Sequence, residues 1–223
     1  AGRAQVAYGA ELARPQIEAM LRAHDKLGQQ EEQALYAALG RPGWGTPGHT
    51  HGARVTHLMA GSAAPGQPDG GMAGQADIVF VQLPQGSLTD TSGQSIPMQV
   101  LDGARYIVAR SGLAPAAAGE AVALVQGEAP SATLCLSLGG TAGPHDGSSM
   151  VEQALDELAL LRGVDVVVAA GNLPARRSAV PSRWLHAQRS VKRGTAGRFL
   201  VHVSAANARH AFVELWMPAD AAG

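Results

Sequence analysis

From residue 76 onward, apolar runs alternate with segments that have helical spacing. The runs "ADIVFVQLP" (76–84), "ATLCLSLGG" (132–140) and "VDVVVAAGN" (164–172) predict buried strands, because they are β-branched and apolar with little alternation. Between them, 95–110 and 148–163 carry apolar residues at helical spacing and predict two helices. Strands alternating with helices of this length predict βαβ units and a parallel sheet, in which ligands bind beyond the carboxyl ends of the strands.

The two flanking regions have other patterns. Residues 12–39 predict one or two helices, and "HGARVTHLMAG" (51–61) predicts a further helix with Val55, Leu58 and Met59 facing inward. In the tail, "RFLVHVSAAN" and "HAFVELWMP" predict a β-hairpin. We therefore expect an α/β fold with a doubly wound, mainly parallel sheet, helices on both faces and a C-terminal β-hairpin. A single domain would span 1–223, with 1–45 as a helical insertion or extension and 174–223 as a loop and hairpin extension.

Composition and charge argue against two classes of partner, nucleic acids and membranes. The formal net charge is −1, so we expect no nucleic-acid partner, and the longest apolar runs are too short for a membrane span. The single cysteine, Cys135, lies in an apolar run and is expected to be a buried, inert thiol.

The helix at 51–61 begins with a histidine. His51 would lie at the helix start, where unpaired N–H groups and the positive end of the dipole disfavour the imidazolium and keep the ring available as a proton acceptor. Gly52 leaves room beside it. A weaker alternative is zinc bound by His49, His51 and His57, but spacings of two and six do not match the i, i+4 pair of a helical metal site. We expect no metal ligands among them.

Two further segments end the predicted strands. Ser137, Leu138, Gly139 and Gly140 form an "SLGG" end, interpreted either as a turn or as a backbone edge that pairs with an extended peptide. Asn172 follows "VVVAAG" and is interpreted either as a turn residue or as an amide that donates to a developing oxyanion.

Together, these segments resemble the subtilisin-like serine proteases, the subtilases. Their histidine motif, H-G-T-H-V-A-G-x-x-A-G, fits at His51, Gly52, Val55, Ala60 and Gly61, while Ala53, Arg54 and His57 depart from it. The S-L-G-G substrate strand and the asparagine after V-V-V-A-A-G follow in the family's order, so the resemblance covers about residues 48–173. It implies that His51 is the general base, Asn172 the oxyanion donor and residues 137–140 the substrate strand. It also implies that the substrate is a protein or peptide. No cofactor is implied; subtilases often bind calcium, but no carboxylate cluster stands out in this sequence.

The other two triad residues have no good match in the chain. The family orders its triad Asp, His, Ser, yet only Asp25 precedes His51, in a polar setting that we expect to be helical. The serines after Asn172 do not stand in G-T-S-x-x-x-P: Ser178, Ser182, Ser190 and Ser204. The chain is thus expected to be a fragment of a protease, one piece of a nicked enzyme whose remaining segment supplies Asp and Ser, or a degenerate homologue that binds peptides without cutting them. The abrupt start and the loss of both triad ends favour a fragment.

Overall fold

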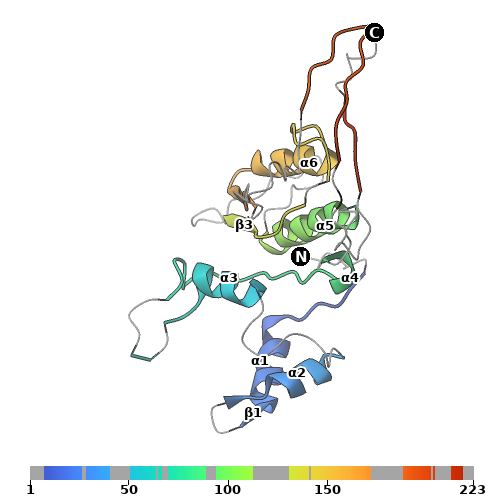
Figure 1. The fold of residues 1–223 in the computed structure, drawn as a ribbon. Coiled ribbons are helices and arrows are strands. Elements are labelled where there is room, and N and C mark those ends of the chain that lie inside the picture. Colours follow the sequence, from blue (N-terminus) through green and yellow to red (C-terminus); the bar gives the residue numbers. More distant parts are fainter. Residues whose placement is uncertain are drawn as a thin grey trace. The chain divides into compact units, whose positions relative to one another are not determined.

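The computed structural model describes the parts of the chain that are drawn as coloured ribbon in Figure 1, and it divides the chain into two compact units, Ala1–Ile78 and Val79–Gly223. The described residues are 8–26, 29–40, 51–63, 65–66, 70–88, 94–112, 131–140, 142–171, 188–201, 203 and 212–217. The boundary between the units falls inside the run 76–84, not near residue 45 or 174. The single domain, with its two extensions, stays a prediction.

The first unit begins with two short helices. Helix α1 (Arg14–Ala23) and helix α2 (Glu32–Ala38) are joined by a two-stranded antiparallel ladder of β1 (Asp25–Lys26) and β2 (Gln29–Gln30). The alternative of two helices over 12–39 is therefore confirmed. Asp25 lies in this ladder, exposed, and not in a helix as expected.

The third helix of this unit, α3 (His51–Ala60), has a C-terminal end closed by a distant part of the chain. The N–H groups of Met72 and Ala73 donate to the carbonyls of Leu58 and Met59 at 3.1 and 2.7 Å, satisfying acceptors that a helix end leaves open. Val55 and Met59 are half-buried, but Leu58, expected on the same face, is 70% exposed. The predicted inward face is therefore wrong at Leu58.

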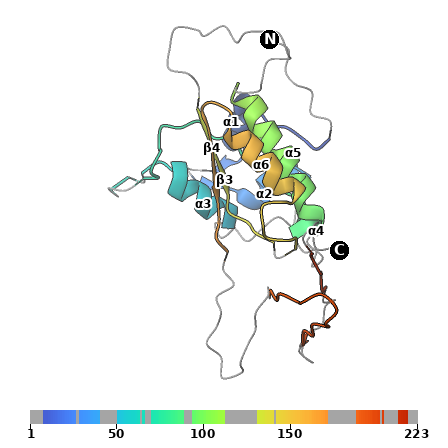
Figure 2. The same cartoon turned by 90° about the horizontal axis from the view of Figure 1, so that it is seen from above.

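The second unit contains a βαβ arrangement. Strands β3 (Ala132–Leu136) and β4 (Val164–Val168) pair in parallel, from Ala132 opposite Val164 to Leu136 opposite Val168, and helix α6 (Met150–Ala159) connects them. Helix α5 (Ser95–Arg110) precedes β3 and has the predicted bounds. Figure 2 shows α5 and α6 side by side next to the two strands.

The core of this unit lies between the helices and one face of the strands. Ala104 and Val108 of α5 pack with Leu134 of β3 and Val164 of β4, and Leu134 is only 1% exposed. The opposite face is more open, since Val167 is 53% exposed. The unit is thus α/β with a two-stranded parallel sheet, while a doubly wound sheet with helices on both faces stays a prediction.

The run 76–84 differs from expectation. The structure assigns it no strand, and in the described part of the chain no neighbouring segment forms a ladder with it. Val81 instead packs on helix α5 at Gly103. A Cβ added at Gly103 would lie only 3.3 Å from a Val81 methyl carbon. The short helix α4 (Gln85–Leu88) follows. Apolar residues alone do not make a strand, since a strand also needs a partner for its N–H and C=O groups.

The tail contains a turn before the predicted hairpin. The Thr195 N–H donates to the Lys192 carbonyl at 3.0 Å, and Gly194 supplies the left-handed φ of 76°. Residues 196–201 and 212–217 follow without an assigned strand, so the predicted hairpin stays a prediction. Within the described residues, no helix is both long and apolar enough to pass through a bilayer.

Candidate functional site

The candidate site lies where β3 and β4 end. The two strands end at the same edge of the sheet, and their pairing continues one step further, because the Ala169 N–H donates to the Leu136 carbonyl at 3.1 Å. Residues 137–140 and 169–171 therefore leave the sheet side by side. The sequence predicted that both segments lie at the carboxyl ends of parallel strands, and the pairing of β3 with β4 makes these two ends neighbours. Asn172, the proposed oxyanion donor, lies outside the described residues.

Residues 137–140 differ in their exposure to solvent. Ser137 and Leu138 are half-buried, and the Ser137 hydroxyl lies 3.4 Å from the Cys135 thiol. Cys135 is itself half-buried, not buried as expected. Gly139 and Gly140 are exposed, and a Cβ at either would meet nothing within 4 Å in the described structure. Neither has a left-handed φ. Among the described residues, nothing in the fold requires glycine at these two positions.

A cavity of about 200 Å³ opens next to this segment. Its walls are mainly apolar and come from α5, the two strand ends and α6: Ile96, Pro97, Val100, Leu136, Leu138, Val168, Val151 and Leu155. An apolar protein cavity of about 150 Å³ holds a benzene molecule. The space is therefore sufficient for one large aliphatic side chain.

The first turn of α6 gives the cavity part of its polar rim. Ser149 and Glu152, both of which line the cavity, form a capping box: the Glu152 N–H donates to the Ser149 hydroxyl oxygen, and the Glu152 carboxylate accepts from the Ser149 N–H at 3.0 Å. Hydrogen bonding from the Ser149 side chain holds the pKa of Glu152 below its ordinary value. This end of the cavity carries a carboxylate that is ionised at neutral pH.

The loop before α6 forms another wall through Gly143, Pro144 and His145. Gly143, His145 and Gly147 have φ of 102°, 56° and 83°, all in the left-handed region. His145 is the exception among them, because residues other than glycine rarely adopt this conformation. The loop is thus bent repeatedly at local conformational cost.

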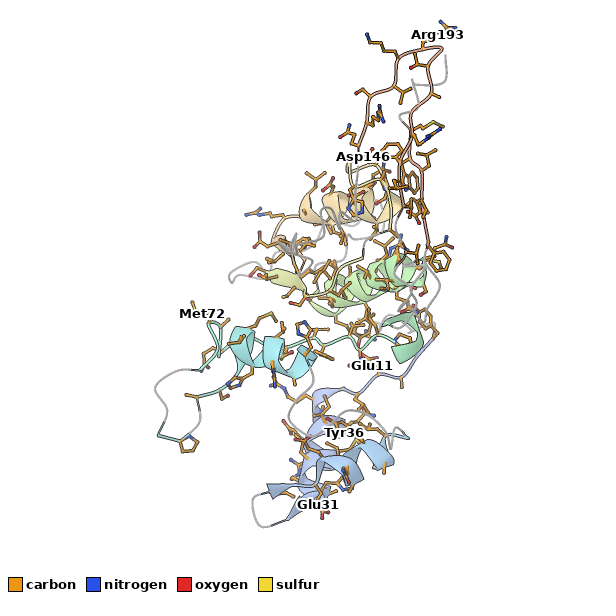
Figure 3. The ribbon with its side chains drawn as sticks, in the orientation of Figure 1. Glu11, Glu31, Tyr36, Met72, Asp146 and Arg193 are labelled. Atoms are coloured by element: carbon orange, nitrogen blue, oxygen red, sulfur yellow. The ribbon has the colours of Figure 1, made fainter. Side chains whose placement is uncertain are left out.

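A residue from the tail holds this loop. The Gly143 N–H donates to Glu214 Oε2 at 2.8 Å, and the Trp216 Nε1–H donates to the same oxygen at 3.1 Å. These donors, that of Gly143 first, hold the pKa of Glu214 below its ordinary value. Figure 3 labels Asp146 in the same loop, where hydrogen bonds from Ser148 lower the pKa of its carboxyl. Sequence reasoning missed Glu214; the available signal was a lone carboxylate within "AFVELWMP".

His51 is the first residue of α3, as the sequence predicted, and its side chain is exposed. Thr56, one turn later, donates its hydroxyl to the Gly52 carbonyl at 2.8 Å and lies against the first turn. His51 belongs to the first unit and residues 137–140 to the second, and the arrangement of the two units is not defined. A shared site for His51 and Asn172 stays a prediction.

The alternative metal site gains no support from the described residues. His51 and His57 are six positions apart on α3, so they point about 120° apart around the helix axis. Within the described ranges, no three His, Cys, Asp or Glu side chains are grouped so as to hold a metal ion. His49 lies outside those ranges.

Comparisons with protein-family models, with curated proteins and with solved structures gave no match to this chain. The resemblance to subtilases therefore depends on its three sequence segments alone, at 51–61, 137–140 and 166–172.

Proposed function

We propose that this chain is the general-base and substrate-binding part of a subtilisin-like serine endopeptidase. One observation supports this most directly: residues 137–140 continue beyond the paired part of β3, next to a mainly apolar cavity, and end in two exposed glycines with open space above them. Two exposed glycines at the end of a strand, beside a pocket for one side chain, leave room for an extended peptide to approach the backbone. The same segment is the one that resembles the substrate strand of subtilases.

In this proposal, backbone and cavity have separate roles. The backbone groups of Gly139 and Gly140 hydrogen-bond the substrate backbone, and the cavity accepts one apolar substrate side chain. Full burial of such a side chain contributes about 1.5–3 kcal/mol, and a half-open cavity gives part of that. The cavity thus selects by size and apolarity, while the backbone contacts are independent of substrate sequence.

The chemical step uses the residues implied by the resemblance. His51 takes the proton from a serine hydroxyl while the serine oxygen attacks the substrate carbonyl carbon. The π electron pair of the C=O bond moves onto the carbonyl oxygen, which becomes an oxyanion. Asn172 donates to that oxyanion; in subtilisin itself, removing such a donor costs about 2.7–4 kcal/mol. His51 then gives its proton to the leaving amine as the C–N bond breaks, and an acyl-serine ester remains. Water attacks this ester while His51 takes the water proton and returns it to the serine oxygen, which releases the carboxylic acid product. In this proposal, the serine and the triad aspartate come from another segment. None of the serines after Asn172 stands in the G-T-S-x-x-x-P motif, and Asp25, the only aspartate before His51, lies exposed in β1.

A second candidate is a module that binds extended peptides without cutting them. It is favoured by the absence of a matching serine motif in this sequence, and it uses the same edge and cavity. The two candidates therefore share their binding site and differ only in catalysis.

A fluorophosphonate probe, which labels activated serines, separates the two candidates. We expect no labelling of the 223-residue chain alone. We expect labelling of the full-length gene product that contains it. In that product, His51→Ala should abolish labelling, while His57→Ala, a change to an exposed histidine on the same helix, should preserve it.

The other outcomes are equally informative. Labelling of the isolated chain would show that one of its own serines is the nucleophile, contrary to our assignment. If neither protein is labelled but the chain binds peptides, the endopeptidase proposal fails and the binding module stands.

A further inference from the structure

Glu214 connects the tail to the cavity. It lies 71 residues after Gly143, and its carboxylate accepts the Gly143 N–H at 2.8 Å. Gly143 lines the cavity, whereas no described tail residue does so itself. The described tail thus touches the cavity wall through a side chain whose position is fixed by a second donor, the indole N–H of Trp216.

The wall that Glu214 contacts is bent against local backbone preference. Its backbone has left-handed φ at Gly143, His145 and Gly147, a combination that local preferences do not favour at His145. Its C-terminal end is held locally, because Asp146 accepts from the Ser148 N–H at 3.0 Å and α6 begins with the capping box at Ser149. Its N-terminal end is held by Glu214.

The hydrogen bond from the Gly143 N–H to the Glu214 carboxylate is of a strong type. A backbone N–H that donates to a carboxylate forms a charge-assisted hydrogen bond, stronger than one between neutral groups. Gly143 is only half-buried and Glu214 is exposed, so water competes for both groups. The expected effect is therefore on the position of the loop, with a small effect on folding.

We propose that Glu214 is a positioning residue for substrate selection: it holds residues 143–145 in place as a wall of the cavity and so sets the preference for an apolar side chain. This inference rests on the proposed function, because it takes an extended peptide as the ligand. It assigns the C-terminal segment an indirect part in substrate binding. Glu214 acts through Gly143 and contacts no reacting atom.

The test uses acetylated, fluorescein-labelled pentapeptides of alanine in which a single leucine is placed at each position in turn. With the wild-type chain, we expect one leucine position to bind about tenfold more tightly than all-alanine, or about 1.4 kcal/mol. Glu214→Ala should reduce this preference to about twofold. Glu214→Gln should keep most of it, because the amide oxygen still accepts the Gly143 N–H. Glu157→Ala, which removes an exposed carboxylate from α6, is the matched control and should keep the full preference.

The ratio of leucine to alanine binding separates positioning from stability, since general destabilisation weakens both peptides alike. If Glu214→Ala keeps the wild-type ratio, the inference is wrong while the proposed function stands. If Glu214→Gln behaves like Glu214→Ala, the negative charge matters and not the hydrogen bond, which also overturns the inference. If no peptide binds the wild-type chain, the proposed function itself fails.

Discussion

Replacing Leu134 by alanine tests whether the strand that carries the candidate site packs against α5. Leu134 is 1% exposed and contacts Ala104, Val108 and Val164 in the core. Three buried carbon atoms are removed, which costs about 2.4 kcal/mol at about 0.8 kcal/mol for each buried methylene. The cavity left behind raises the cost, so we expect unfolding to become easier by about 3 kcal/mol, within the range of about 2.7–5 kcal/mol for such substitutions.

The free energy of unfolding would be measured by urea denaturation followed by far-ultraviolet circular dichroism. Thr133→Ala is the matched control, because Thr133 is the preceding residue of the same strand and is exposed; it should cost less than about 1 kcal/mol. A cost below about 1 kcal/mol for Leu134→Ala would refute the packing of α5 on β3. Because residues 137–140 continue directly from β3, peptide binding should weaken together with stability in Leu134→Ala.

Three further predictions concern the site and its supports. Hydrogen bonding from Ser149 lowers the pKa of Glu152 on folding, so the carboxylate contributes stability above its ordinary pKa of 4.5, and this contribution is lost as pH falls through the lower folded pKa. The difference in unfolding free energy between wild type and Glu152→Ala, measured by urea titration, should therefore shrink below pH 4.5. Gly71→Ala should cost about 1–3 kcal/mol in the same assay, because its Cβ would lie 2.6 Å from backbone atoms at the end of α3. Gly139→Ala and Gly140→Ala should leave stability within about 0.5 kcal/mol of wild type. Each should weaken binding of the alanine-leucine pentapeptides about fivefold, as measured by fluorescence anisotropy, because the added methyl group keeps the peptide from approaching closely enough to form one backbone hydrogen bond.

Each of these predictions has an outcome that contradicts it. A stability difference for Glu152→Ala that stays constant from about pH 6 to about pH 3 would show that the carboxylate does not act through its ionised form. Gly71→Ala with wild-type stability would mean that the segment after Gly70 does not approach α3. Unchanged peptide binding in both Gly139→Ala and Gly140→Ala would place the ligand elsewhere.

The regular elements of the second unit could be predicted because their signals are local. Helix α5 has the predicted bounds, and the chain turns after it at Gly112, whose φ is 74°. Strands β3 and β4 were predicted from apolar runs, and their parallel pairing follows from the helix between them. The run 76–84 has equally apolar residues but no ladder partner among the described residues, which the sequence of the run itself does not reveal.

The candidate site was predicted only in part, for the same reason. Residues 137–140 and the segment before Asn172 were found because each ends an apolar run, and the structure brings the two strand ends together. The link from Glu214 to Gly143 was not predicted, since it joins residues 71 positions apart through a single hydrogen bond. Contacts of this kind depend on the path of the whole chain, and no periodicity records them.

The closure of α3 by Met72 and Ala73 has a practical consequence. The excursion between Gly61 and Gly71 begins and ends at the same place, since the Gly71 N–H donates to the Gly61 carbonyl at 2.7 Å. Doubling the length of such a loop adds only about 0.6 kcal/mol of closure entropy. Pro65 and Gly66 are both exposed, so an epitope or a dye-labelled peptide could be inserted between them. Such a label would lie close to α3 in sequence, and the hydrogen bonds from Met72 and Ala73 to the C-terminal end of α3 would remain.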